Sequence, residues 1–131
     1  MDFTVIICTF NRARNLPACL GHLARQEGVA DLQLEVIVVD NNSTDSTPAL
    51  VESEFPQVIV IRRSDNSGFA AACNEGVRAA RGEFVLLLNN DTIPDAASLD
   101  LLVDFMREHP ACAAAGGRLL NADRSFQAGY A

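Results

Sequence analysis

The sequence contains no lysine, so all ten of its positively charged residues are arginine, and its formal net charge is −7. The arginines form no basic run, which makes nucleic acids and anionic membrane surfaces poor partners. The absence of lysine also excludes a P-loop, because Gly-x-x-x-x-Gly-Lys-Ser/Thr needs a lysine for the phosphates. An acidic chain can still bind a phosphate through a metal ion, a helix N-terminus or a local arginine.

Other familiar motifs are also missing. No Gly-x-Gly-x-x-Gly follows the first apolar run, which argues against a dinucleotide-binding domain. There is no Gly-x-Ser-x-Gly, and His22 and His109 fall on or beside predicted helices, which argues against a Ser-His-Asp hydrolase. The four cysteines have no metal-ligand spacing and fall in apolar patterns, so we predict buried, reduced thiols, as in a cytosolic protein. No apolar run approaches the roughly 18 residues of a membrane span.

The 131 residues match the size of one domain and alternate between two apolar patterns. Unbroken β-rich runs predict strands at residues 3–9, 34–39, 58–61, 84–88 and 112–115. Helical spacing predicts helices between Asn15 and Gly28 and at 47–55, 67–81 and 95–108, and a hairpin is predicted at 118–130. This alternation predicts an α/β fold, a Rossmann-like three-layer α/β/α sandwich with a mainly parallel sheet.

Some packing details are predicted as well. The run Phe84–Leu88 has no polar alternation, which is typical of a strand buried on both faces. The helix at 67–81 is expected to be capped by Ser67 and to bury one stripe, formed by Phe69, Cys73, Val77 and Ala80. Asp45 and Ser46 are interpreted as caps of the helix at 47–55.

Polar residues gather at the carboxyl ends of the predicted strands. In a parallel sheet these ends share one edge, where open α/β sheets bind their ligands. The residues are Thr9, Asn11 and Arg12 after the first strand, 40–45 after the second, Asn66 after the third, and Asn89, Asn90 and Asp91 after the fourth. Taken alone, Asn-Asn-Asp also favours a plain turn. The four sets together predict a binding site.

Four motifs, in this order, carry a more specific signal. They are Val-Ile-Ile-Cys-Thr-Phe-Asn-Arg at 5–12, Val-Ile-Val-Val-Asp-Asn-Asn-Ser-Thr-Asp at 36–45, Asn-Ser-Gly-Phe-Ala-Ala-Ala-Cys-Asn-Glu-Gly at 66–76, and Phe-Val-Leu-Leu-Leu-Asn-Asn-Asp-Thr at 84–92. Together they resemble the family 2 glycosyltransferases, and most closely the rhamnosyltransferase-like branch. The resemblance implies a glycosyltransferase-A fold. It also implies an inverting enzyme that moves a sugar from a UDP- or dTDP-sugar to a saccharide or lipid-linked acceptor.

The resemblance further implies roles for individual residues. Family positions that contact the nucleoside are matched by Thr9 and Asp40, and the loop beside the nucleoside is matched by Asn11 and Arg12. The family's segment near the base and phosphates is matched by Asn66 and Gly68. Its Asp-x-Asp motif is matched by Asn89, Asn90 and Asp91. That motif holds the donor through a divalent metal, Mg²⁺ or Mn²⁺. In this sequence Asn89 replaces the first Asp of the motif, so Asp91 is the expected metal ligand. With one carboxylate, the affinity for the metal in the absence of the donor should be weak.

The family's general base lies on an acidic residue beyond the Asp-x-Asp strand. No matching segment precedes Ala131. We therefore expect residues 1–131 to be a single nucleotide-sugar-binding domain, cut short at its C-terminal end and weakly active or inactive alone, with the base beyond Ala131. The full-length protein is expected to be cytoplasmic, at the inner face of the membrane, and an exposed apolar edge should favour a homodimer.

Two alternatives stay open. One is a nucleotide-sugar-binding module without catalysis. The other is a nucleotidyltransferase, which would need a basic, glycine-rich phosphate loop after the first strand, whereas residues 8–12 contain neither glycine nor lysine.

Overall fold

The computed structural model describes residues 1–26 and 33–128. Its elements are, in order, β1 (Phe3–Thr9), α1 (Leu16–Leu23), β2 (Leu34–Asp40), α2 (Thr47–Glu54), β3 (Ile59–Arg62), α3 (Phe69–Ala79), β4 (Phe84–Asn89) and α4 (Ser98–Glu108). Strands and helices therefore alternate as predicted, while Gly28, the predicted end of the first helix, lies outside the described residues. Within these residues, none of the helices has the length and hydrophobicity needed to cross a membrane.

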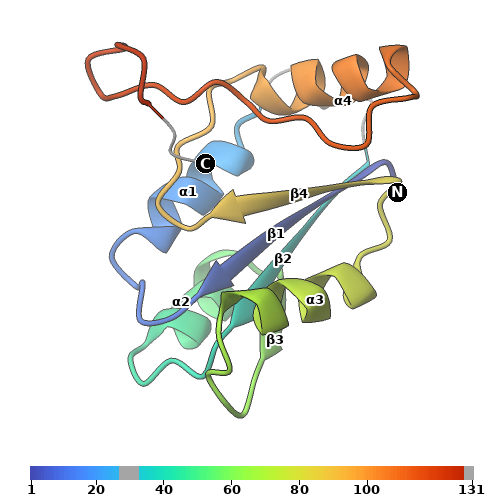
Figure 1. Ribbon diagram of the computed structural model, residues 1–131. Helices are drawn as coiled ribbons and strands as arrows, with labels where there is room; N and C mark the ends of the chain where they lie inside the picture. Colours follow the sequence, from blue (N-terminus) through green and yellow to red (C-terminus); the bar gives the residue numbers. More distant parts are fainter. Residues whose placement is uncertain (27–32, 129–131) are drawn as a thin grey trace.

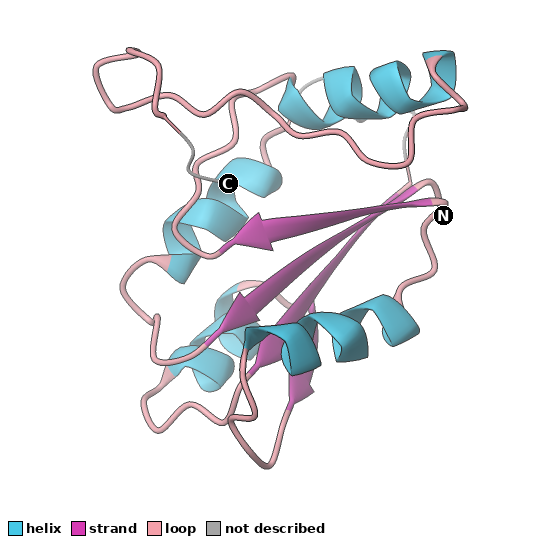
Figure 2. Ribbon diagram, viewed as in Figure 1, coloured by secondary structure: helices cyan, strands magenta, loops and turns pink. Residues whose placement is uncertain are grey.

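The four strands form one parallel sheet in the order β3-β2-β1-β4. All four strands point in the same direction, so their carboxyl ends lie along one edge, which runs from β4 at the left of Figure 1 to β3 at the lower centre. Helix α3 covers one face of the sheet, and α1, α2 and α4 pack against the other face (Figures 1 and 2). This arrangement confirms the predicted three-layer α/β/α sandwich.

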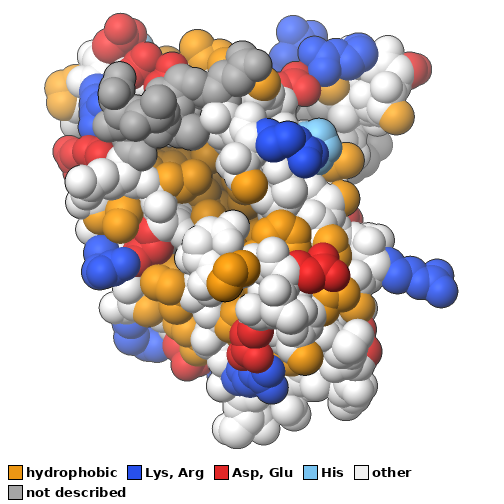
Figure 3. Space-filling view, turned by 180° about the vertical axis from the view of Figure 1, so that it is seen from behind, with side chains coloured by type: hydrophobic (Ala, Val, Ile, Leu, Met, Phe, Trp, Pro, Cys, Tyr) orange, Lys and Arg blue, Asp and Glu red, His pale blue; other side chains and the backbone are white. Residues whose placement is uncertain are grey.

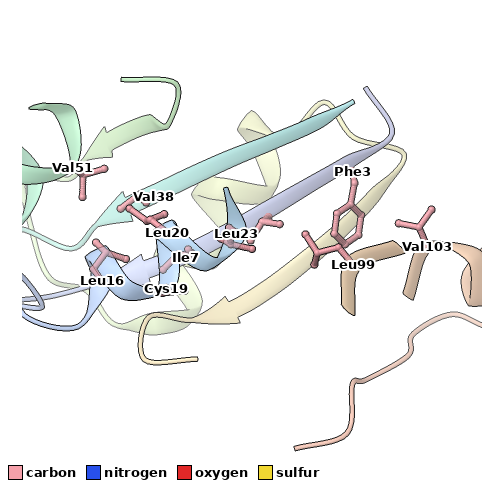
Figure 4. Close-up of a cluster of buried hydrophobic side chains, with 11 residues drawn as sticks. Phe3, Ile7, Leu16, Cys19, Leu20, Leu23, Val38, Val51, Leu99 and Val103 are labelled. Carbon is pink, nitrogen blue, oxygen red and sulfur yellow. The ribbon is translucent and has the colours of Figure 1, made fainter. Parts of the chain in front are cut away.

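The larger core lies between the sheet and the helices α1, α2 and α4. Strand β1 is buried along its whole length, because it pairs on both sides and is covered on both faces. The predicted stripe of α1 is confirmed, with Leu16, Cys19, Leu20 and Leu23 all buried. Figure 4 shows these side chains on the same side of the sheet as Ile7 and Val38, while Leu99 and Val103 of α4 lie near Phe3.

Helix α3 approaches the sheet through small residues. Its buried positions are Ala72, Cys73 and Gly76. The prediction that Phe69 and Val77 are buried is wrong, because these side chains are 59% and 47% exposed. A Cβ atom added to Gly76 would lie 2.5 Å from Cγ2 of Ile6 and 3.2 Å from Cγ2 of Val39, so the close packing requires a glycine there. This close approach rotates the buried stripe away from the two large side chains.

The helix caps follow the sequence only in part. Asp45 caps α2 as predicted, because its Oδ1 accepts a hydrogen bond from the backbone N of Thr47 at 2.9 Å. Ser46 makes no side-chain capping bond. Ser67 does not cap α3 either, since its hydroxyl accepts a hydrogen bond from Arg63 at 2.6 Å. The loop before α3 is therefore organised by the arginine.

Strand β4 is partly buried on one face and exposed on the other, which corrects the prediction of burial on both faces. Its side chains alternate, and Val85 and Leu87 are 41% and 50% exposed. The reason is its place at the end of the sheet, because α3 packs over β1 and β2 rather than over β4. An apolar strip of β4 is therefore open on the α3 side of the described structure.

The segment after α4 differs most from its prediction. No strand forms at 112–115, and residues 107–119 are exposed apart from Cys112, which is half-buried. The predicted hairpin is reduced to a single antiparallel bridge between Leu120 and Phe126, and Tyr130 lies outside the described residues. Three of the four cysteines are buried as predicted, and Cys112 is the exception.

A buried carboxylate holds the opposite edge of the sheet together. The side chain of Glu35 on β2 is 2% exposed and accepts hydrogen bonds from Oγ1 of Thr4 at 3.0 Å and from the backbone N and Nε of Arg81 at 3.1 and 2.7 Å. The backbone N of Gly82 in turn donates to Thr4 at 2.9 Å. Burial alone would raise the pKa of Glu35, but the hydrogen bonds from Arg81 and Thr4 outweigh it and lower the pKa.

Glu35→Gln is expected to lower the free energy of unfolding by about 1.5–3 kcal/mol at pH 7, because hydrogen bonds to a buried charge are weakened. The pKa of Glu35 is lower in the folded chain than in the unfolded chain. The contribution of the Glu35 carboxylate to the free energy of unfolding is therefore fully present above about pH 4.3, its pKa in the unfolded chain. That contribution is lost as the pH falls through the pKa of Glu35 in the folded chain. The difference between the variant and the wild type should shrink in acid. Urea unfolding followed by circular dichroism between pH 3 and 7 measures both effects.

The matched control is Glu52→Gln, which breaks the exposed pair between Glu52 and Arg62, whose side chains are 48% and 52% exposed. This change should alter the free energy of unfolding by no more than about 0.5 kcal/mol. Equal losses in the two variants, or a Glu35→Gln cost that persists undiminished at pH 3, would contradict the role assigned to Glu35.

Candidate functional site

The carboxyl edge of the sheet brings the predicted residues of β1, β2 and β4 to one level. Thr9 is the register partner of Asp40, and Cys8 is the partner of Asn89. The loops that follow these strands lie together at the left of Figure 1. Asn66 lies in the exposed loop between β3 and α3.

The loop after β1 is fastened to the loop after β2 by Asn11. The backbone of Asn11 has a φ of +52°, and its Oδ1 accepts hydrogen bonds from the backbone N of Thr44 at 2.8 Å and of Asp45 at 3.2 Å. Its own backbone N donates to Oγ of Ser43 at 2.9 Å. The side chain of Asn11 therefore holds two loops together, and the neighbouring Arg12 is left exposed.

Asp40 supports the same loop from within the sheet. Its side chain is buried, and its carboxylate accepts hydrogen bonds from the backbone N of Ser43 at 3.0 Å and from the Ser43 hydroxyl. Oγ of Ser43 in turn accepts a hydrogen bond from the backbone N–H of Asn11. A chain of hydrogen bonds thus runs from Asp40 through Ser43 to the loop after β1.

A hollow of about 220 Å³, here called the Thr9 hollow, opens between these loops and α3. Its lining residues are Cys8, Thr9, Phe10, Arg12, Asn41, Phe69 and Asn90. Thr9 and Asn41 are only 3% and 6% exposed, and within the described residues Oγ1 of Thr9 and Oδ1 of Asn41 have no hydrogen-bond partner. Buried polar atoms in native proteins are nearly always partnered, so these two atoms are suited to a polar ligand.

The walls of the Thr9 hollow add apolar and fixed polar features. Nδ2 of Asn41 donates to the backbone O of Gly68 at 3.2 Å, which orients the amide of Asn41. Gly68 has a φ of +97°, a conformation that favours glycine, and α3 begins at the next residue, Phe69. Phe10 and Phe69 are 43% and 59% exposed, and their rings suit a flat ligand.

Asn41 was included in the polar set 40–45 predicted from sequence but had no individual role, and Phe10 and Phe69 were given no role in the site. The signal for Asn41 was its place directly after Asp40 at the end of a buried strand. Phe69 instead matched a helical apolar stripe, so its pattern pointed to the core. Phe10 carried no separate signal beyond its place in the loop after the first strand.

A second hollow of about 240 Å³, here called the Asp91 hollow, lies beside the first. Its lining residues are Arg14, Asn15, Ala18, Cys19, Asp91, Thr92 and Ile93. Nδ2 of Asn90 donates to the backbone O of Cys8 at 3.0 Å, which ties the segment after β4 to β1. The backbone N of Thr92 donates to the O of Asn89 at 3.1 Å. Asn89 to Asp91 thus form a turn that also places Asn90 in one hollow and Asp91 in the other.

The exposed carboxylate of Asp91 is the group best suited to a metal ion at this edge. No cluster of three or more His, Cys, Asp or Glu side chains occurs in the part of the chain that the structure describes. Burial and the nearby Asp91 carboxylate raise the pKa of Cys19 to about 11, so this thiol stays protonated at neutral pH. Asp91 therefore fits Mg²⁺ or Mn²⁺ where the remaining ligands come from a phosphate and water.

Two arginines in the loop after β1 can be compared with the arginines that pair with carboxylates. Arg62, Arg63, Arg81, Arg107 and Arg124 form ion pairs with carboxylates. Among residues 1–26 and 33–128, Arg12 and Arg14 form none, which leaves both available to an anion. On the face shown in Figure 3, basic and acidic side chains lie in small separate groups between apolar ones.

The chain is similar in sequence to known glycosyltransferases. The sequence profile described as Glycosyl transferase family 2 matches residues 4–130. The succinoglycan biosynthesis protein ExoO of Rhizobium meliloti is 37% identical over 91 residues, which cover 69% of this chain and 25% of that protein. A PGL/p-HBAD biosynthesis glycosyltransferase of Mycobacterium bovis is 36% identical over 111 residues, covering 82% of this chain and 42% of that protein. The chain thus spans less than half the length of these curated relatives.

Solved structures show the same fold. TarS 1-349 of S. aureus in complex with UDP-GlcNAc superposes with a TM-score of 0.76 at 33% identity, covering 84% of this chain and 32% of that one. The mannosyltransferase PcManGT of Pyrobaculum calidifontis, in complex with GDP-Man and Mn²⁺, has a TM-score of 0.72 at 32% identity, covering 79% of this chain and 32% of that one. The fold is the glycosyltransferase-A fold, and the chain belongs to glycosyl transferase family 2.

Proposed function

We propose that this chain binds the UDP- or dTDP-sugar donor of an inverting, metal-assisted sugar transfer. The observation that carries the proposal is that Thr9 and Asn41, which line a hollow together with two exposed phenylalanines, each keep a buried polar atom without a partner among the described residues. The edge of a uracil or thymine ring offers both an N–H and carbonyl oxygens. Oδ1 of Asn41 can accept from the N–H, and the hydroxyl of Thr9 can donate to a carbonyl.

The diphosphate would then lie toward the Asp91 hollow, because Asn90 and Asp91 are adjacent and line the two hollows in turn. A divalent ion held by Asp91 would supply Lewis-acid stabilisation of the charge that builds on the leaving diphosphate. Arg12 and Arg14 offset the same negative charge from the loop after β1. The complexes of TarS with UDP-GlcNAc and of PcManGT with GDP-Man and Mn²⁺ support this proposal by similarity.

The acceptor side of the reaction is proposed to come from further polypeptide. Asp91 is the one carboxylate among the residues that line the two hollows, and it is assigned to the metal. Glu108 and Asp123, the later carboxylates considered from sequence, are exposed and line neither hollow. We therefore propose a general base beyond Ala131, acting on a hydroxyl of a saccharide or lipid-linked acceptor.

Calorimetric titration with UDP tests the donor site. Binding should be tighter in Mn²⁺ or Mg²⁺ than in EDTA by about tenfold or more, or roughly 1.4 kcal/mol, because the ion links Asp91 to the diphosphate. NAD serves as the comparison ligand. Tighter binding of NAD than of UDP would contradict a pyrimidine diphosphate site.

Asp91→Asn should remove the metal-dependent gain in UDP affinity and leave the thermal midpoint unchanged, because the side chain is exposed and outside the core. The matched control is Asp95→Asn, which removes an exposed carboxylate paired with Arg124 just after the same turn. That variant should keep the metal effect. If Asp91→Asn binds UDP with metal as the wild type does, Asp91 is only a turn residue.

Asn41→Ala should weaken UDP binding by about 10- to 100-fold, because a hydrogen bond to the base is lost and its partner is left unpaired. The loss should be the same in EDTA and in Mn²⁺, since Asn41 is assigned to the base. Inorganic pyrophosphate with Mn²⁺ is the control ligand, and its affinity should not change. An equal loss for pyrophosphate and UDP would show that Asn41 only shapes the loop.

A further inference from the structure

Two cysteines from different layers of the fold meet beneath the Thr9 hollow. Sγ of Cys8, near the end of β1, lies 3.4 Å from Sγ of Cys73 on α3. Each residue is 7% exposed, and both are free thiols. A disulfide bond is about 2.0 Å long, so a closing movement of about 1.4 Å would join the two sulfurs.

The other two cysteines lie too far away in the fold to pair with Cys8 or Cys73. Cys8 and Cys73 belong to the smaller core cluster under α3. Cys19 is buried in the other cluster, across the sheet, and Cys112 lies beyond α4. Cys8 also lines the Thr9 hollow, and this hollow is the entry route that we assign to a small reagent.

We propose that Cys8 and Cys73 form a reversible intramolecular disulfide with an oxidant of the hydroperoxide class, and that this bond narrows the Thr9 hollow. One thiol loses its proton, its sulfur attacks a peroxide oxygen, and the O–O bond breaks. The departing hydroxide takes up the proton, so a sulfenic acid and water form. The second thiol then attacks the sulfenic sulfur, which makes the S–S bond and releases a second water. Two thiols lose two electrons and two protons, and hydrogen peroxide is reduced to two waters.

The environment keeps the pair reduced until such an oxidant arrives. Burial, together with the neighbouring Cys73, raises the pKa of the Cys8 thiol to about 12, although Arg63 acts in the opposite direction. At neutral pH the Cys8 thiol is therefore protonated, and because the thiolate is the reactive form, oxidation is slow and needs sustained exposure to the oxidant. Small size and access through the hollow select the hydroperoxide over bulky disulfide reagents.

Formation of the disulfide would change the shape of the Thr9 hollow in two ways. Phe69 lies one helical turn before Cys73, so drawing Cys73 toward β1 moves the phenylalanine that lines the hollow. The backbone O of Cys8 accepts the hydrogen bond from Asn90, so a shift of Cys8 also reaches the turn that carries Asp91. The effect on UDP rests on the proposed function, whereas formation of the bond does not.

The test uses Cys112→Ser as the reference, which removes the half-buried thiol and with it intermolecular cross-linking. After treatment with hydrogen peroxide under native conditions, the intact mass should fall by about 2 Da, and dithiothreitol should restore it. Peptide mapping should find Cys8 joined to Cys73. Adding Cys73→Ser to the reference should abolish the loss of mass, and Cys73→Ala provides a second variant if the serine disturbs folding.

An unchanged mass, a gain of oxygen atoms without a cross-link, or a Cys8–Cys19 link would overturn the proposal. Titration of the oxidised and reduced reference with UDP and Mn²⁺ should show weaker binding to the oxidised form, by about threefold or more. Equal affinities would overturn the link to the hollow. A reduced reference that binds no UDP would instead count against the proposed function, and the mass measurement would still decide whether the bond forms.

Discussion

The parallel pairing of β1 with β2 on one side and β4 on the other is the constraint on which the site depends. It sets Thr9 beside Asp40 and Cys8 beside Asn89, so three loops far apart in sequence leave the sheet at one level. Burial of β1 on both faces fixes this register, because a slip of one residue would move every side chain to the opposite face. The opposite edge is held by Glu35 and Arg81.

Polar residues at the carboxyl edge divide into two groups by what their atoms contact. One group makes hydrogen bonds within the loops, to other members of the group and to the neighbouring backbone, and so holds the loops in place. Its members are Asn11, Asp40 and Ser43. Thr9 and Asn41 are buried, as Asp40 is, but keep one unpartnered oxygen each within the described chain. A single sequence motif can include both groups, and only the geometry separates the residues that hold the loops from those that keep an unpartnered buried oxygen beside the hollow.

Sequence alone predicted the layers, the parallel sheet and the edge that carries Asp91, because unbroken apolar runs and helical spacing are local properties. It was wrong where a neighbour decides the outcome. Five apolar residues in a row do not reveal that β4 ends the sheet, and a helical stripe does not reveal that Gly76 lets α3 turn Phe69 outward. The roles of Asp40, Asn66, Asn89 and the other assigned residues stay predictions.

The order β3-β2-β1-β4 gives the two hollows different surroundings. The Thr9 hollow lies mainly between α3 and the loops of the inner strands β1 and β2, and the segment after β4 contributes Asn90 to its lining. The Asp91 hollow follows β4, whose outer backbone groups can still pair with another strand. A sheet that grows past β4 would therefore add new walls around Asp91 and leave the Thr9 side as it is. One end of a bound donor would be fixed by this domain, while the other could be adapted by whatever is joined to it.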